Sequence, residues 1–137
     1  MTMREFRACV LSAILLFLFL GKAESQPGFS LLQSVHFAVY YQKDITDSEA
    51  QKSADYLEKD YSYMVDKLGM ELRSPLTVRI YGAVGSYLSG TKQRYPWRLA
   101  LYQRRILHVQ PVKVLMEKDQ FEKALSYELA VALLEQA

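Results

Sequence analysis

The sequence predicts an α+β fold, in which a small mixed sheet carries one long packed helix and a second helix follows at the C-terminal end. Three observations predict this fold. Short runs rich in β-branched and aromatic residues recur over residues 35–41, 76–81 and 105–110. Residues 46–69 show a single apolar stripe at helical spacing. From Phe121 onward the chain is rich in Ala, Leu and Glu, which favour helix.

The long helix has a local signal at each end. Thr46 and Glu49 stand three residues apart, hydroxyl first and carboxylate second, as in a capping box. Gly69 is expected to end the helix, because glycine adopts the left-handed conformation found there. The apolar stripe between these ends consists of Ala50, Ala54, Leu57, Tyr61, Met64, Val65 and Leu68.

The three predicted strands differ in their burial pattern. Residues 35–41 are apolar on both faces, which is typical of a buried strand. Residues 76–81 alternate, so one face of that strand is expected to be wetter. Pro111 closes the third strand, 105–110. Between the last two strands, three glycines predict a short turn or a single helical turn, and residues 91–101 are expected to be irregular.

The N-terminal residues form a separate unit from this fold. Two arginines precede an uncharged apolar run over residues 8–20, and small residues follow it, which is the order of a secretory signal peptide. The run is shorter than the roughly 20 residues of a membrane-spanning helix. We therefore expect an exported protein, periplasmic or secreted, with residues 1–23 as the signal, 24–33 as a linker and 34–137 as the folded domain, which we expect to be incomplete at its C-terminal end. A membrane anchor made by an uncleaved signal is the alternative.

The charge of the expected mature chain is balanced. Removing residues 1–23 takes three of the 17 basic residues and one of the 15 acidic residues, which leaves 14 of each. An exported chain without net charge is not expected to bind nucleic acid. The single cysteine, Cys9, lies in the apolar run, so the mature chain would have neither a disulfide nor a thiolate ligand.

A single carboxylate, Glu128, stands in the otherwise apolar C-terminal helix. Residues 127–131 have the spacing of the zinc-peptidase motif H-E-x-x-H. In that motif two histidines on one helix face hold the metal, and the glutamate activates the bound water. Here Tyr127 and Val131 stand at the two histidine positions. An ordinary core helix, with Glu128 facing solvent or paired with a basic side chain, is the alternative interpretation.

Together with the strands and the capped helix before it, this segment resembles the N-terminal half of a gluzincin-type zinc metallopeptidase. It looks most like the secreted bacterial domains called peptidase MA-like. The resemblance covers residues 35–137 and implies a zincin-like fold with Glu128 at the position of the general base. It also implies a substrate cleft edged by the strand 105–110, toward which Glu128 would point, with Tyr127 and Val131 in the space of the imidazoles. Because the ligand positions are degenerate, we expect no zinc, no other cofactor and no hydrolysis.

Two histidines remain, His36 and His108, and both fall on predicted strands. Histidines that alternate with apolar neighbours are usually hydrogen-bonded core or edge residues. The pair would form a metal site with an acidic residue only if the two strands were neighbours.

Residues 92–105 are a second candidate site, because this stretch combines basic and aromatic residues and contains no acid. Arginine beside aromatic rings is typical of surfaces that bind glycans or single-stranded nucleic acid. Export and charge balance favour an anionic glycan. The alternative is a solvated loop pinned to the core by its aromatic residues. The candidate binding residues are Arg94, Trp97, Arg98, Arg104 and Arg105.

The sequence therefore predicts an exported peptidase MA-like domain that has lost its zinc ligands, as a non-catalytic or a truncated metallopeptidase homologue. Its partner is open, and a peptide, a protein or an envelope glycan would each be compatible. Two further functions stay open. One is an exported α+β binding module that uses residues 92–105, and the other is the front half of an active metallopeptidase relative.

Overall fold

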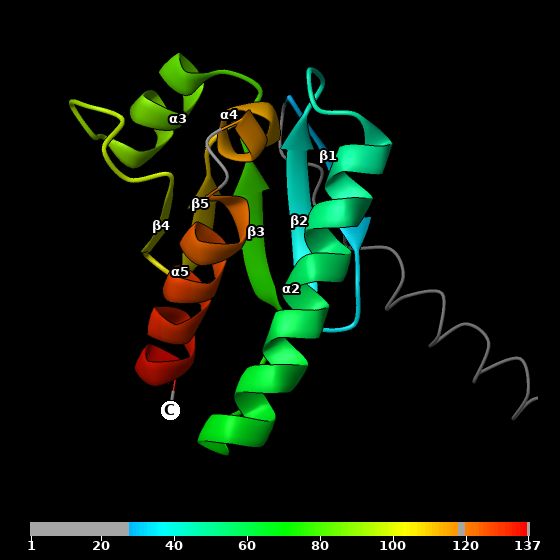
Figure 1. Cartoon of the computed structure of the whole chain (residues 1–137). Coiled ribbons are helices and arrows are strands. Elements are labelled where there is room, and N and C mark those ends of the chain that lie inside the picture. The colour runs from blue at the N-terminus through cyan, green and yellow to red at the C-terminus, as the bar shows by residue number, and fades with distance from the viewer. Residues whose placement is uncertain (1–27, 118–119, 137) are drawn as a thin grey trace, which may run out of the picture.

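The structure is a computed structural model, which describes residues 28–117 and 120–136 (Figure 1). Within these residues the chain forms one five-stranded sheet with the order β1-β2-β3-β5-β4. The strands are β1 (Phe29–Gln33), β2 (Phe37–Gln42), β3 (Leu76–Ile80), β4 (Ala100–Gln103) and β5 (Ile106–Val109). The helices are α2 (Asp47–Leu68), α3 (Val84–Thr91), α4 (Val112–Glu117) and α5 (Phe121–Gln136).

The sheet is mixed, which confirms the predicted α+β fold. Its three central strands are parallel, and β1 and β4 pair antiparallel to them at the two edges. The long helix α2 and the C-terminal helix α5 lie side by side on one face of the sheet (Figure 1). The hydroxyl of Tyr56 on α2 lies 2.9 Å from the hydroxyl of Ser126 on α5 and joins the two helices.

The core lies between the sheet and these two helices. Every second residue of the central strands β2 and β3 is buried, and the residues between them are only half-buried. This alternation is expected of a sheet that has one face on the core. The buried residues of these strands are Phe37, Val39, Tyr41, Leu76, Val78 and Ile80.

Both ends of α2 agree with the sequence prediction. The hydroxyl of Thr46 accepts a hydrogen bond from the N–H of Glu49 at 3.1 Å, and the Glu49 carboxylate accepts one from the N–H of Thr46 at 2.8 Å. At the other end Gly69 is left-handed, with φ 66°, and donates its N–H to the carbonyl of Val65. These short-range contacts confirm the capping box and the glycine stop.

The two edge strands and two short helices differ from the prediction. Residues 29–33, which were expected to belong to a linker, form β1. Residues 100–103, at the boundary of a stretch expected to be irregular, form β4. The predicted glycine turn is the eight-residue helix α3, and α4 was not predicted. β4 and β5 are joined by Arg104 and Arg105, both at positive φ. Turns of that kind usually contain Asn or Gly, so this hairpin lacks the usual sequence signal.

In the part of the chain that the structure describes, no helix combines the length and hydrophobicity needed to cross a bilayer. The predicted signal peptide, residues 1–23, lies outside the described residues.

Candidate functional site

Glu128 is buried against the edge of the sheet. Its side chain is only 4% exposed, and its Oε2 accepts a hydrogen bond of 2.8 Å from the backbone N–H of Tyr102 on β4. The two-residue turn after Gln103 makes Gln103 and Ile106 a hydrogen-bonded pair. Tyr102, the residue before Gln103, therefore turns its N–H away from β5. The Glu128 carboxylate therefore accepts a hydrogen bond from a backbone N–H of the edge strand that would otherwise have no partner in the sheet.

A groove of about 400 Å³ lies next to this contact. Residues 97–100 form one wall of the groove. The first half of α5 forms the other, with Lys123 and Tyr127, and Glu128 also lines the groove. Glu128 thus lies beside a groove and is buried, so the solvent-facing position that the core-helix alternative allowed for it is wrong.

The strand that borders this groove differs from the expected one. The strand 105–110 was predicted to edge the cleft, but β5 lies inside the sheet between β3 and β4. The tight turn at Arg104 and Arg105 folds β4 back outside β5, so β4 and the residues before it border the groove.

The two degenerate ligand positions lie in different surroundings. The Tyr127 side chain is 63% exposed and lines the groove. Val131, one helical turn later, is half-buried and packs against the hydrophobic core. Tyr127 is thus available to a ligand, whereas Val131 contributes mainly to packing.

The loop wall of the groove is held from beneath by buried polar side chains. Gln110 donates its Nε2 to the carbonyls of Pro96, at 3.3 Å, and Arg98, at 3.1 Å. The Tyr87 hydroxyl donates to the same Arg98 carbonyl at 2.7 Å. Burial, followed by the nearby charge of Glu128, raises the pKa of Tyr87, so this hydroxyl stays protonated and keeps donating. The wall is therefore fixed before any ligand arrives.

Trp97, at the outer end of this wall, is 82% exposed. Its ring centroid lies 5.9 Å from that of Tyr95, with the two planes at 56°. The prediction that these rings pin the loop to the core is wrong, because both rings are exposed, and Gln110 and Tyr87 hold the loop through its backbone.

The predicted basic surface divides into two parts. Arg98 lines the groove, and Arg94 is exposed in the same loop. Arg104 and Arg105 form the turn at the far end of β4, and Arg105 lines a different cavity. The structure adds Lys123, which sequence reasoning missed. Its position four residues before Tyr127 on the same helix face was the available signal.

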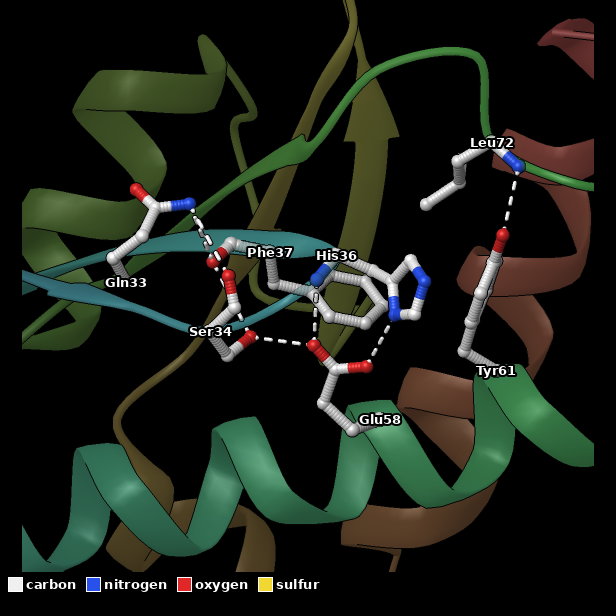
Figure 2. A network of polar contacts seen from close by, with 7 residues as sticks. All are labelled: Gln33, Ser34, His36, Phe37, Glu58, Tyr61 and Leu72. Atoms are coloured by element: carbon white, nitrogen blue, oxygen red, sulfur yellow. Dashed lines mark hydrogen bonds and ion pairs between the residues drawn. The ribbon is translucent and has the colours of Figure 1, made fainter. Parts of the chain in front are cut away.

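The second site with close polar contacts is centred on Glu58 of α2 (Figure 2). Its Oε1 accepts from the Ser34 hydroxyl and from the His36 N–H, both at 2.7 Å, and its Oε2 lies 2.6 Å from His36 Nδ1. His36 lies in the turn between β1 and β2, not on a strand as predicted. Because Ser34 contacts the carboxylate rather than the imidazole, the three residues do not form a nucleophile–base pair. Their hydrogen bonds hold the turn between β1 and β2 against α2.

The contacts of Glu58 predict how the stability of the protein depends on this carboxylate and on pH. Burial raises the pKa of the Glu58 carboxyl, but the hydrogen bonds from His36 and Ser34 outweigh it, so the pKa is below its usual value of 4.5. The stabilisation is present above the unfolded pKa and is lost as the pH falls through the folded pKa. Glu58→Ala is therefore expected to lower the free energy of unfolding by about 1–2 kcal/mol at neutral pH. Urea titrations at pH 7 and pH 3 would measure this.

The difference between the Glu58→Ala variant and the unchanged protein should shrink at the lower pH, where the carboxylate is protonated. Glu71→Ala, which removes an exposed carboxylate beside the same turn, is the matched control and should change little. A Glu58→Ala effect of the same size at both pH values would contradict the role assigned to the ionised carboxylate.

His108 lies on β5 and is buried on the sheet face opposite α2 and α5. Its Nδ1 is 2.8 Å from the Tyr81 hydroxyl, and burial together with the nearby charge of Arg79 lowers the pKa of His108 to about 4. β3 separates its strand from β2, so His108 and His36 do not form the pair considered from the sequence. Among residues 28–117 and 120–136, no three His, Cys, Asp or Glu side chains are grouped as a metal site.

Comparison with known proteins identifies no relative of this chain. No protein-family model, no curated protein and no solved structure matches it. Function is therefore inferred from the residues and the geometry described above.

Proposed function

We propose that the chain is an exported, non-catalytic domain of the peptidase MA-like type, which binds its partner in the groove beside β4. The observation that carries this proposal is the position of Glu128. The carboxylate stands where the resemblance expects a general base, at a groove between a helix and an edge strand, yet one of its oxygens holds the Tyr102 N–H. This contact gives the buried carboxylate a structural role that needs no metal.

The order of the elements supports the relation to the metallopeptidases. A long helix follows the first parallel strand, an antiparallel edge strand follows the second, and the helix with Glu128 packs against that edge. The succession of strand, long helix, strands and a helix that carries Glu128 is the feature on which the resemblance rests, although β4 and not the expected strand 105–110 lies at the edge.

The side chains at the ligand positions support the absence of catalysis. A catalytic zinc ion in a peptidase usually has three protein ligands, two of them from the H-E-x-x-H helix. Tyr127 offers a phenol in place of one imidazole, and Val131 offers only hydrocarbon, which packs on the core. Without those ligands no metal-bound water would form beside Glu128 by this mechanism.

The groove itself supports a binding role. Trp97 and Tyr127 stand on opposite walls and are mostly exposed. Trp, Tyr and Arg are the residues most enriched among those that dominate binding energy at interfaces. A wall fixed in advance by Gln110 and Tyr87 also lowers the entropy lost on binding.

Trp97→Ala is expected to reduce binding at the groove by at least about tenfold, because an exposed aromatic hot spot contributes roughly 2 kcal/mol. The measurement is binding of the purified protein to arrayed random peptides and to arrayed envelope polysaccharides. Tyr63→Ala is the matched control, since Tyr63 is 62% exposed on α2 and does not line the groove. Equal binding by the Trp97→Ala and Tyr63→Ala variants would remove the groove from consideration.

The non-catalytic part of the proposal has its own test. After dialysis against zinc, the protein should carry no stoichiometric Zn²⁺ and should not cleave a quenched fluorescent peptide library. A stoichiometric zinc ion, together with peptide cleavage that is lost in Glu128→Gln, would instead support the active-peptidase alternative.

An exported glycan-binding module is the second candidate function. The observation that favours it is the exposed ring pair Tyr95 and Trp97, because sugar faces stack on such rings. A loss of polysaccharide binding in Tyr95→Ala, with peptide binding unchanged, would select this candidate.

A further inference from the structure

We infer that the pocket beside Glu58 is a second binding site, which takes a primary alkylammonium group. The pocket has a volume of about 390 Å³, and among the described residues none lines both this pocket and the groove. The inference therefore does not depend on the proposed function. Three observations carry it, namely an oriented imidazole nitrogen, the sign of the charge around the pocket, and the combination of acceptors with apolar walls.

Glu58 determines which nitrogen of His36 is the hydrogen-bond acceptor. Despite its partial burial, Glu58 is ionised at neutral pH, because hydrogen bonds from His36 and Ser34 lower the pKa of its carboxyl. An ionised carboxylate only accepts, so the His36 Nδ1, which lies 2.6 Å from Glu58 Oε2, carries a proton. In the neutral ring Nε2 is then an acceptor. Figure 2 shows this nitrogen turned away from Glu58, on the side where Tyr61 and Leu72 border the pocket.

The walls of the pocket are held in place before a ligand binds. The His36 N–H donates to Glu58 Oε1 at 2.7 Å, and the His36 carbonyl accepts from the Leu76 N–H at 2.9 Å. On the other side of the pocket, the Leu72 N–H donates at 3.0 Å to the hydroxyl of the buried Tyr61, which positions the segment after α2. Because these groups are already ordered, little conformational entropy is lost when a ligand enters.

The charge around the pocket is negative. Glu58 and Glu71 both line it, and none of its described lining residues is Lys or Arg. Because the chain after residue 23 carries equal numbers of acidic and basic residues, this negative charge is a local property. Such a pocket favours a cation over an anion. A zinc ion usually takes three or more protein ligands, and the described residues group no three His, Cys, Asp or Glu side chains in that way. An organic cation is therefore the better match.

The acceptors and the apolar walls together suit a primary ammonium on an alkyl chain. An alkylammonium group has three N–H donors and no acceptor. The pocket offers three acceptors from three segments, namely His36 Nε2 in the turn after β1, the Ser62 hydroxyl on α2 and the Glu71 carboxylate before β3. Val65 and Leu72 supply apolar surface for the methylene groups. Lysine side chains and free polyamines both have this chemistry.

The test is an NMR titration with n-pentylamine at pH 8, which keeps the amine protonated and favours the neutral imidazole. We expect a dissociation constant of about 1 mM. The ¹⁵N signal of His36 Nε2 should move as the ammonium donates to it, whereas the signals of His108, which does not line the pocket, should stay in place. n-Pentanol has the same chain without the charge and should bind at least about fivefold more weakly, and pentanoate should not bind.

Glu71→Gln tests the contribution of the charge. We expect it to weaken the binding of n-pentylamine by about fivefold, the upper range for an exposed ion pair, and to leave n-pentanol unaffected. Glu122→Gln makes the same change of charge on α5, away from the pocket, and is the matched control that should keep the original affinity. Both carboxylates are exposed, so equal urea midpoints are expected and would show that both variants fold.

Two further ligands distinguish the sources of the ammonium group. Cadaverine represents a free polyamine, and Nα-acetyl-lysine methylamide represents a lysine side chain of a protein partner. Tighter binding of cadaverine would assign the pocket to polyamines. Equal or tighter binding of the lysine derivative would assign it to a partner's lysine.

The remaining outcomes overturn the inference. Equal affinity for n-pentylamine and n-pentanol would show that the pocket does not recognise the charge. Binding of n-pentylamine that leaves the His36 Nε2 signal in place, or that Glu71→Gln does not weaken, would place the amine elsewhere on the protein. Tighter binding of n-butylguanidine would replace the alkylammonium with a guanidinium. None of these results bears on the groove, whose test uses Trp97→Ala.

Discussion

Replacing Glu128 with alanine is expected to lower the free energy of unfolding by about 3 kcal/mol. The change removes the acceptor of the Tyr102 N–H at a buried sheet edge and leaves a small cavity between α5 and β4. Glu128→Gln keeps an acceptor oxygen and should lose only about 1 kcal/mol, because a neutral hydrogen bond is weaker than a charge-assisted one. Urea unfolding followed by circular dichroism would give all these values.

Glu122→Ala is the control for this experiment, since Glu122 lies on the same helix and is exposed. Its effect should stay within about 0.5 kcal/mol. If Glu128→Ala were no more destabilising than Glu122→Ala, the carboxylate would have no structural role, and retention of Glu128 would need a catalytic or binding explanation.

Acidification is expected to destabilise the protein by up to about 3 kcal/mol between pH 6.5 and pH 4 through His108 alone. The pKa of this imidazole is about 4 in the folded chain and 6.5 in the unfolded chain. Between these values the unfolded chain binds more protons, so stability rises with pH over this window. Burial and the Arg79 charge exclude the imidazolium form, while the neutral ring contacts the Tyr81 hydroxyl. Urea titrations at several pH values would show the slope.

His108→Gln removes the titrating group and keeps a polar side chain near Tyr81. This variant should be less stable at pH 7 but should lose about 3 kcal/mol less than the unchanged protein on going to pH 4. Carboxylates such as Glu58 contribute at lower pH, and both proteins share that contribution. Parallel pH profiles for the two proteins would show that the pKa of His108 is the same in the folded and the unfolded chain and would contradict this prediction.

The elements that could be predicted from the sequence are those whose signals are local. The capping box of α2 and its glycine stop depend on contacts within one turn, and both are present. The central strands are buried on at least one face, and their apolar patterns identified them within one or two residues. The start of α5 at Phe121 likewise agrees with the composition of that segment.

The features that could not be predicted depend on contacts between distant residues. β1 and β4 are short edge strands, and the turn that creates β4 uses two arginines in a conformation that glycine and asparagine usually adopt. α5 is apolar around most of its circumference, so periodicity could not show which side faces the core. The burial of Glu128 therefore became visible only when the edge strand was in place beside it.

The parallel pairing of the central strands has a consequence for the rate of folding. The β4–β5 hairpin joins neighbours in sequence, and such hairpins form in microseconds. Phe37 pairs with Leu76 only after the whole of α2 has been spanned, and the loop entropy of that connection opposes the first contact. The slow step of folding is therefore expected to be the pairing of β2 with β3. The hairpin that borders the groove would form early, before the sheet to which it belongs.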